Sequence, residues 1–265
     1  MLVAHRGGAK LAPENTVVAF RAGVEEWGAD MLEMDVRLTR CGQVIVFHDA
    51  RLDRTTNGSG LVADHTLEQI RALDAGHHFV DLAGLHSYRG QSVRVPTLSE
   101  VLEACPDVRI NVEVKEARVA ARLVDVIDRH TAHDRVLIAA EMETWRRDAA
   151  GYPGPWGASR AQGMRFWLTH RLPGGGPYTP RADIFQLPEF WKGHRILSRR
   201  FIREAQRRNI PVQVWTVDEP DDMRRLISWG VDGIQTDRPD VLASVLMEVV
   251  GRAPPPSKSA TEASA

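Results

Sequence analysis

Carboxylate side chains recur at alternate positions in two apolar segments of the sequence. Glu33 and Asp35 lie two residues apart in the first segment, and Glu113 lies two residues before Lys115 in the second. Residues two apart on a strand share a face, so the three carboxylates can converge. Buried carboxylates need a cation, and ligation by oxygen alone suits Mg²⁺ or Ca²⁺ better than Zn²⁺. The alternative is that they form salt bridges with nearby bases, namely Arg6, Arg37 and Lys115.

Two histidines, His5 and His48, end short β-branched or apolar runs. Only five residues separate the run that contains Asp35 from the run that ends at His48. This connection is too short for a parallel crossover, so we expect an antiparallel hairpin. With the turn centred on Cys41-Gly42, residues whose numbers sum to 83 face each other, which places Asp35 opposite His48. A histidine pair in a carboxylate-rich pocket suits general acid–base catalysis near neutral pH.

Two basic residues accompany these groups. Arg6 directly follows His5, and Lys115 ends the segment that contains Glu113. A guanidinium holds an anion with a bidentate fork, and an ammonium acts as a point charge. We therefore expect an anionic substrate, with phosphate as the natural choice.

Three further residues each have two interpretations. Glu14 and Asn15 precede an amphipathic stretch, where Asn15 or Thr16 is a typical helix N-cap. In the alternative, Glu14 and Asn15 orient a ligand or a metal-bound water. Trp215 ends an apolar run, where its indole either packs in the core or forms the wall of a pocket.

The order of the elements predicts an α/β fold that positions these residues. Amphipathic stretches with helical spacing lie between most of the short apolar runs, as in β-α units with a parallel sheet. Removing the return strand of the hairpin leaves eight strands, the number in a (β/α)8 TIM barrel, whose active site forms at the carboxyl ends of the strands. An open doubly wound sheet is the alternative. The expected strands are Leu2–His5, Met31–Leu38, Val44–His48, Val108–Lys115, Arg135–Ala140, Trp156–Ser159, Asp183–Leu187, Pro211–Val217 and Gly233–Thr236. The expected helices include Thr16–Trp27, Leu98–Ala104, Val119–His130, Ser198–Arg208 and Pro220–Trp229.

The predicted domain organisation is one barrel domain over residues 1–250. Residues from about 49 to 96 lack clear strand and helix alternation, which indicates a small inserted subdomain after the hairpin. Residues 251–265 are rich in proline, serine and alanine and are expected to form a disordered tail.

Composition excludes several classes of function. The net charge is −1, so no bulk positive field favours nucleic acid. Two cysteines are too few for a disulfide framework or a four-thiolate zinc site. No stretch of the sequence predicts a transmembrane span or a signal peptide. We expect a cytoplasmic protein with a small-molecule substrate, without integral membrane association, that forms a monomer or a homodimer.

Several motifs together resemble the glycerophosphodiester phosphodiesterase family, in its bacterial form. They occur in family order across residues 3 to about 246, and this coverage makes the resemblance specific. The motifs are His5-Arg6-Gly7, Pro13-Glu14-Asn15-Thr16, Glu33-Met34-Asp35, Phe47-His48-Asp49, Leu52-Asp53-Arg54-Thr55-Thr56, Asn111-Val112-Glu113-Val114-Lys115, Val214-Trp215-Thr216-Val217 and Thr236-Asp237-Arg238-Pro239.

The resemblance implies a TIM barrel with an insertion after the hairpin and a role for each matching residue. Glu33, Asp35 and Glu113 would hold a divalent cation, Mg²⁺ or Ca²⁺, and His5 and His48 would be the catalytic pair. His5 would be the base and His48 the acid, although the sequence also allows the reverse order. The implied substrate contacts are Arg6, Lys115, Glu14, Asn15 and Trp215.

The implied activity is metal-dependent hydrolysis of glycerophosphodiesters to glycerol 3-phosphate and an alcohol. Attack by water and attack by the glycerol 2-hydroxyl through a cyclic phosphate both remain open. The alternatives are a lysophospholipid phosphodiesterase on the same scaffold and a non-catalytic phosphate-binding protein. A glycosidase would leave the histidines and Arg6 without a role. The sequence departs from the family pattern at Cys41 and Glu141, and Glu141 could alter substrate preference.

Overall fold

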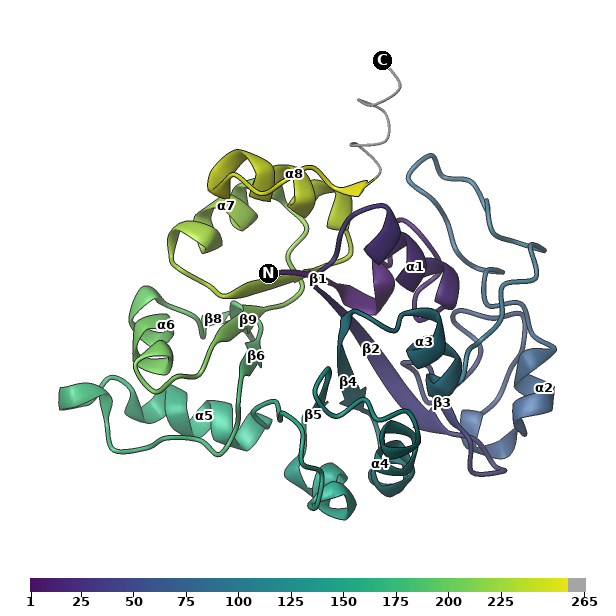
Figure 1. The fold of residues 1–265 in the computed structure, drawn as a ribbon, viewed down its shortest axis with the longest axis horizontal. Helices are drawn as coiled ribbons and strands as arrows, with labels where there is room; N and C mark the ends of the chain where they lie inside the picture. The colour runs from purple at the N-terminus through teal and green to yellow at the C-terminus, as the bar shows by residue number, and fades with distance from the viewer. Residues whose placement is uncertain (257–265) are drawn as a thin grey trace.

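Seven parallel strands form the main sheet of the computed structural model, which describes residues 1–256. Their order is β5-β4-β2-β1-β10-β9-β6, and Figure 1 shows the strands at the centre with helices outside them. The strands are β1 (Leu2–Ala4), β2 (Met31–Leu38), β4 (Arg109–Val114), β5 (Val136–Ala140), β6 (Phe185–Leu187), β9 (Val212–Val214) and β10 (Gly233–Thr236). Residues 257–265 of the predicted tail lie outside the described part of the chain.

The segment Trp156–Gly157 joins the two edges of this sheet. Trp156 forms a parallel bridge with Ile138 of β5, and Gly157 forms one with Ile184, just before β6. The Gly157 N–H donates to the Ile138 carbonyl at 2.9 Å, and the Ala158 N–H donates to the Ile184 carbonyl at 2.8 Å. The predicted (β/α)8 barrel is confirmed, although its fifth position is two bridges where the sequence predicted a strand over Trp156–Ser159.

Amphipathic helices cover the outside of the barrel because each has one apolar face. In α4, for example, Leu123, Val126 and Ile127 are buried against the strands. Hydroxyl side chains begin five of the helices by accepting a backbone N–H: Thr16, Thr66, Thr97, Ser159 and Ser198. The helices are α1 (Val17–Glu25), α2 (Leu67–Arg71), α3 (Leu98–Ala104), α4 (Ala120–Arg129), α5 (Arg160–Thr169), α6 (Arg199–Gln206), α7 (Pro220–Ser228) and α8 (Pro239–Val250). Short 3₁₀ turns occur at His5–Gly7, Val62–Asp64, Ala117–Val119, Glu143–Ala149 and Pro173–Gly175.

The expected hairpin is present, but its predicted register is wrong by one residue. Strand β3 (Val44–Val46) is antiparallel to β2, with Val36 opposite Val46 and Leu38 opposite Val44. The Phe47 N–H donates to the Asp35 carbonyl, so Phe47 takes the place predicted for His48. The cause is a three-residue loop that ends in Gly42 at φ +79°, because such loops place their last residue in the left-handed region.

The inserted segment packs through its own small apolar cluster. Leu52, Val62 and Ile70 from the insertion are buried against Ile45 and Phe47 of the hairpin.

The structure also contains an antiparallel pair that the sequence did not predict, β7 (Phe190–Trp191) and β8 (His194–Arg195). In the described part of the chain, no helix is both long and apolar enough to cross a membrane.

Candidate active site

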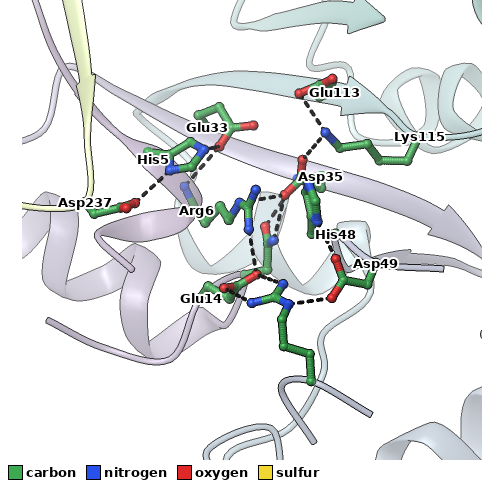
Figure 2. A network of polar contacts seen from close by, with 12 residues as sticks. His5, Arg6, Glu14, Glu33, Asp35, His48, Asp49, Glu113, Lys115 and Asp237 are labelled. Carbon is green, nitrogen blue, oxygen red and sulfur yellow. Dashed lines mark hydrogen bonds and ion pairs between the residues drawn. The ribbon is translucent and has the colours of Figure 1, made fainter. Parts of the chain in front are cut away.

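Strand register brings the predicted site residues together at one end of the barrel. Ala4 of β1 pairs with Leu32 of β2, which puts the following residues, His5 and Glu33, at the same level. Asp35 of β2 pairs directly with Glu113 of β4. Figure 2 shows the side chains of these residues pointing into one cluster with Arg6, Lys115 and His48.

Three carboxylates form the centre of the cluster. Glu33 and Asp35 are almost fully buried, with 2% and 1% of their surfaces exposed, and Glu113 is half-buried. One oxygen from each lies within 4.8 Å of the others. Oxygens bound to a single Ca²⁺ at about 2.4 Å can be no farther apart than that. The donor set therefore fits a hard divalent cation.

Basic residues neutralise only part of this negative charge. The Lys115 ammonium lies 3.0 Å from Asp35 Oδ1 and 2.9 Å from Glu113 Oε2, and Arg6 Nε lies 3.2 Å from Asp35 Oδ2. The third base in the salt-bridge alternative, Arg37, donates to the His48 carbonyl instead. Within residues 1–256, Glu33 has no ion pair with lysine or arginine and accepts a hydrogen bond from the Arg6 backbone N–H at 3.0 Å.

The two buried carboxylates have opposite pKa shifts because their neighbours differ. Burial, with Asp35 and Glu113 nearby, raises the pKa of Glu33 to about 7, although His5 and Arg6 oppose the shift. Burial also favours the neutral form of Asp35, but Lys115, Arg6 and His48 outweigh it and lower its pKa to about 2. Asp35 is thus ionised, and Glu33 titrates near neutral pH.

Each of the two histidines contacts a carboxylate through Nδ1. His5 Nδ1 lies 2.7 Å from Asp237 Oδ1, and His48 Nδ1 lies 2.6 Å from Asp49 Oδ1. Burial disfavours the charged form of His5, but Glu33 and Asp237 outweigh it and raise the His5 pKa. These contacts orient both rings and leave each Nε2 for another partner; His5 Nε2 lies 3.8 Å from Glu33.

Asp49 and Asp237 are site residues to which sequence reasoning gave no role, although both stand in the quoted motifs. The signal for Asp49 was its position directly after His48. Asp237 follows the last strand of the barrel and is 232 residues from His5, so only the closed fold shows the contact.

The loop between β1 and α1 brings Glu14 and Asn15 to the cluster. Thr16 is the N-cap of α1, so Asn15 is free to donate to Asp35 Oδ2 at 2.9 Å and to accept the Asp35 N–H at 3.2 Å. Asn15 has φ +59°, a conformation that asparagine tolerates better than most residues. Glu14 accepts from Arg6 Nη1 at 2.9 Å. Both residues therefore contact charged groups of the cluster.

Trp215 directly follows β9. Its surface is 37% exposed, and it lines a cavity of about 610 Å³ together with Lys10, Phe190 and Asp218. Asp218 accepts the Asp237 N–H at 2.8 Å, which connects this cavity to the His5 side of the cluster. This environment supports the pocket-wall interpretation of the indole. Glu141, where the sequence departs from the family pattern, forms an ion pair with Arg160 at 3.0 Å.

The sequence matches a known protein family over most of its length. The family model described as the glycerophosphoryl diester phosphodiesterase family matches residues 5–150 and 167–241. The chain belongs to this family. It is 33% identical over 255 residues to a glycerophosphodiester phosphodiesterase of Caldanaerobacter subterraneus, covering 93% of this chain and 97% of the relative. Membership makes the protein an enzyme, a phosphoric diester hydrolase.

Solved structures share the fold. The glycerophosphoryl diester phosphodiesterase domain of an uncharacterised protein from Mycobacterium tuberculosis superposes with a TM-score of 0.82 at 22% identity, covering 94% of this chain and 98% of that one. An Oleispira antarctica phosphodiesterase, solved in complex with the product sn-glycerol-3-phosphate, gives a TM-score of 0.74 at 23% identity, covering 93% and 96%.

Proposed function

We propose that the protein hydrolyses glycerophosphodiesters to glycerol 3-phosphate and an alcohol, using a divalent cation held by Glu33, Asp35 and Glu113. The observation that carries the proposal is the convergence of three carboxylate oxygens within 4.8 Å, next to two carboxylate-oriented histidines. The glycerol 3-phosphate in the Oleispira antarctica relative supports the product. When bound, the cation would stabilise negative charge on the phosphoryl oxygens.

The side chains of this protein divide the remaining work. Arg6 and Lys115 bind the phosphate and stabilise the charge that grows as the phosphoryl centre goes from one negative charge towards two. His5 Nε2 takes a proton from the attacking oxygen, and His48 Nε2 gives one to the departing alkoxide, which leaves poorly without protonation. Asp237 and Asp49 hold the two imidazoles with Nε2 towards the substrate.

Product analysis tests the proposal. Phosphorus NMR on glycerophosphocholine, glycerophosphoethanolamine and glycerophosphoglycerol should show glycerol 3-phosphate, with activity that disappears with chelator and returns with Mg²⁺ or Ca²⁺. Full turnover after exhaustive metal removal would exclude the metal role. H5A and H48A should each lower kcat by about 10²–10⁴-fold. A nitrophenyl diester, which has a good leaving group, should rescue H48A and not H5A; equal responses would contradict the assigned roles.

One observation favours a second candidate, a lysophospholipid phosphodiesterase. The cavity that Asp218 lines also contains the exposed rings of Trp215 and Phe190, whose surfaces are 37% and 50% accessible. Such rings can contact an acyl chain. Lysophosphatidylcholine, included in the same assay, distinguishes the two substrates. Cytoplasmic location and the monomeric or homodimeric state stay predictions.

A further inference from the structure

Arg54 is a charged residue of the inserted segment that the proposed mechanism does not use. Its Nη1 and Nη2 donate to Glu14 Oε2 and Oε1, each at 2.7 Å. Its Nε donates to Asp49 Oδ2 at 2.5 Å. One guanidinium therefore joins the loop after β1 to the segment after β3, and about half of the Arg54 side chain is exposed.

The two carboxylates that Arg54 holds each contact a different group of the site. Glu14 Oε1 also accepts from Arg6 Nη1 at 2.9 Å, and Asp49 Oδ1 contacts His48 Nδ1 at 2.6 Å. Figure 2 shows both contacts on the same side of the cluster. Arg54 thus contacts the proposed phosphate-binding residue Arg6 through Glu14, and the proposed acid His48 through Asp49.

We infer that Arg54 is a positioning residue that fixes Arg6 through Glu14 and His48 through Asp49. The inference rests on the proposed function for the roles of Arg6 and His48. Without Arg54, Glu14 would keep one basic partner and draw Arg6 towards itself, away from Asp35 and the phosphate. Asp49 would lose the group that fixes its rotamer, and the His48 ring would lose its fixed orientation. The inserted segment thereby contributes a group on which the geometry of the site depends.

The fork of the guanidinium is essential to this role. Three N–H groups of one planar group reach two carboxylates, whereas an ammonium is a compact point charge that lacks this planar arrangement. We therefore expect R54K to behave much like R54Q. Arg51 is a matched control because it lies in the same segment and pairs with exposed Asp53 at 3.1 Å, away from the cluster.

Kinetics on two substrates test the inference. R54Q and R54K should lower kcat/KM on glycerophosphoethanolamine by about 10²-fold, the size expected when reacting groups are misplaced. Part of the loss should appear in KM, through Arg6, and part in kcat, through His48. The kcat loss should shrink on a nitrophenyl diester, which needs less help from the acid. R51Q should stay within twofold of the unmodified protein on both substrates.

Double variants separate positioning from a general structural role. R54Q/D49N should lose little more kcat than D49N alone, because Arg54 acts on His48 through Asp49. R54Q/E14Q should raise KM little more than E14Q alone, because Arg54 acts on Arg6 through Glu14. Unchanged kinetics in R54Q, or losses that are equal for both substrates and additive with both partners, would overturn the inference. Thermal unfolding of R54Q, R54K and R51Q checks that each variant folds.

A binding measurement keeps the inference separate from the proposed function. Calorimetry with glycerol 3-phosphate should show weaker binding by R54Q than by R51Q, by about tenfold. If the unmodified protein binds glycerol 3-phosphate but cleaves no diester, the proposed function fails. The comparison of R54Q with R51Q in binding then still tests whether Arg54 positions Arg6 through Glu14. Equal affinity in the two variants would overturn that path.

Discussion

Glu33 differs from its two neighbouring carboxylates because, among the described residues, it forms no ion pair with a lysine or arginine side chain. Burial and the nearby negative charges raise its pKa to about 7. Because the pKa of Glu33 is higher in the folded protein than in the unfolded chain, the protonated carboxyl stabilises the metal-free fold. This contribution is complete below the ordinary pKa of a glutamate and is lost as pH rises towards 7. A cation must displace the same proton, so metal affinity should rise over the same range.

We therefore expect Mg²⁺ or Ca²⁺ to raise the unfolding temperature more at pH 8 than at pH 5.5. Thermal unfolding with chelator and with saturating cation at both pH values measures the two increments. E33Q is the control because it removes one of the three proposed ligands, and it should lose most of the increment at both pH values. An increment that is equal at the two values, or larger at pH 5.5, would contradict the role of Glu33.

The sequence was sufficient to predict which residues gather at the site but not how they contact one another. The alternation of Glu33 with Asp35 and of Glu113 with Lys115 fixes the shared face of each strand, because side chains alternate along a strand. The contacts of His5 with Asp237 and of Arg54 with Glu14 connect residues far apart in the chain. They depend on barrel closure and on the path of the insertion, which no local pattern specifies.

At the level of the elements, the length of one hairpin loop accounts for the error in the predicted register. A two-residue turn centred on Cys41-Gly42 gives a sum of 83, whereas the observed pairs sum to 82. The predicted two-residue turn and the observed three-residue loop both accept a glycine at position 42, so the glycine itself does not distinguish the two registers. The strand predicted over Trp156–Ser159 for the fifth barrel position is observed as two bridges, one each from Trp156 and Gly157. The helix Leu98–Ala104 was predicted with the observed ends, whereas the predicted helix Thr16–Trp27 is observed as Val17–Glu25.

Two glycine-to-alanine changes should affect stability in opposite directions. Gly42 has φ +79° in the hairpin loop, so G42A should lower the free energy of unfolding by about 1 kcal/mol through backbone strain. Gly163 lies inside α5, where G163A should raise it by about 0.5–1 kcal/mol through helix propensity. A Cβ meets no atom within 4 Å at either position, so packing does not interfere. Urea unfolding measures both changes, and changes of the same sign would contradict this account.

At the level of the whole molecule, the barrel is held together where its first and last elements meet. Strand β1 lies between β2 and β10, and the Met1 amino group donates to the Asp232 carbonyl at 2.7 Å. After α8, Arg252 donates to both oxygens of Asp30, at 2.7 and 2.9 Å, and to the Gly28 carbonyl at 2.6 Å. Asp30 in turn accepts the Leu2 N–H at 2.6 Å. Arg252 therefore contacts the barrel, although it lies in the stretch 251–265 that the sequence predicted to be a disordered tail.

Removing the contacts of Arg252 should destabilise the whole domain. R252Q loses a partly buried bidentate pair, and within residues 1–256 it leaves Asp30 with only the hydrogen bond from the Leu2 N–H. The free energy of unfolding should therefore fall by about 1–2 kcal/mol. Arg224 is the matched control, because it also forms a forked pair, with Glu248, but on the exposed surface between α7 and α8. Urea unfolding should show a smaller loss for R224Q, since solvent screens that pair. Equal losses in the two variants would mean that Arg252 acts as an ordinary surface charge and that the first and last elements are held by β1 and β10 alone.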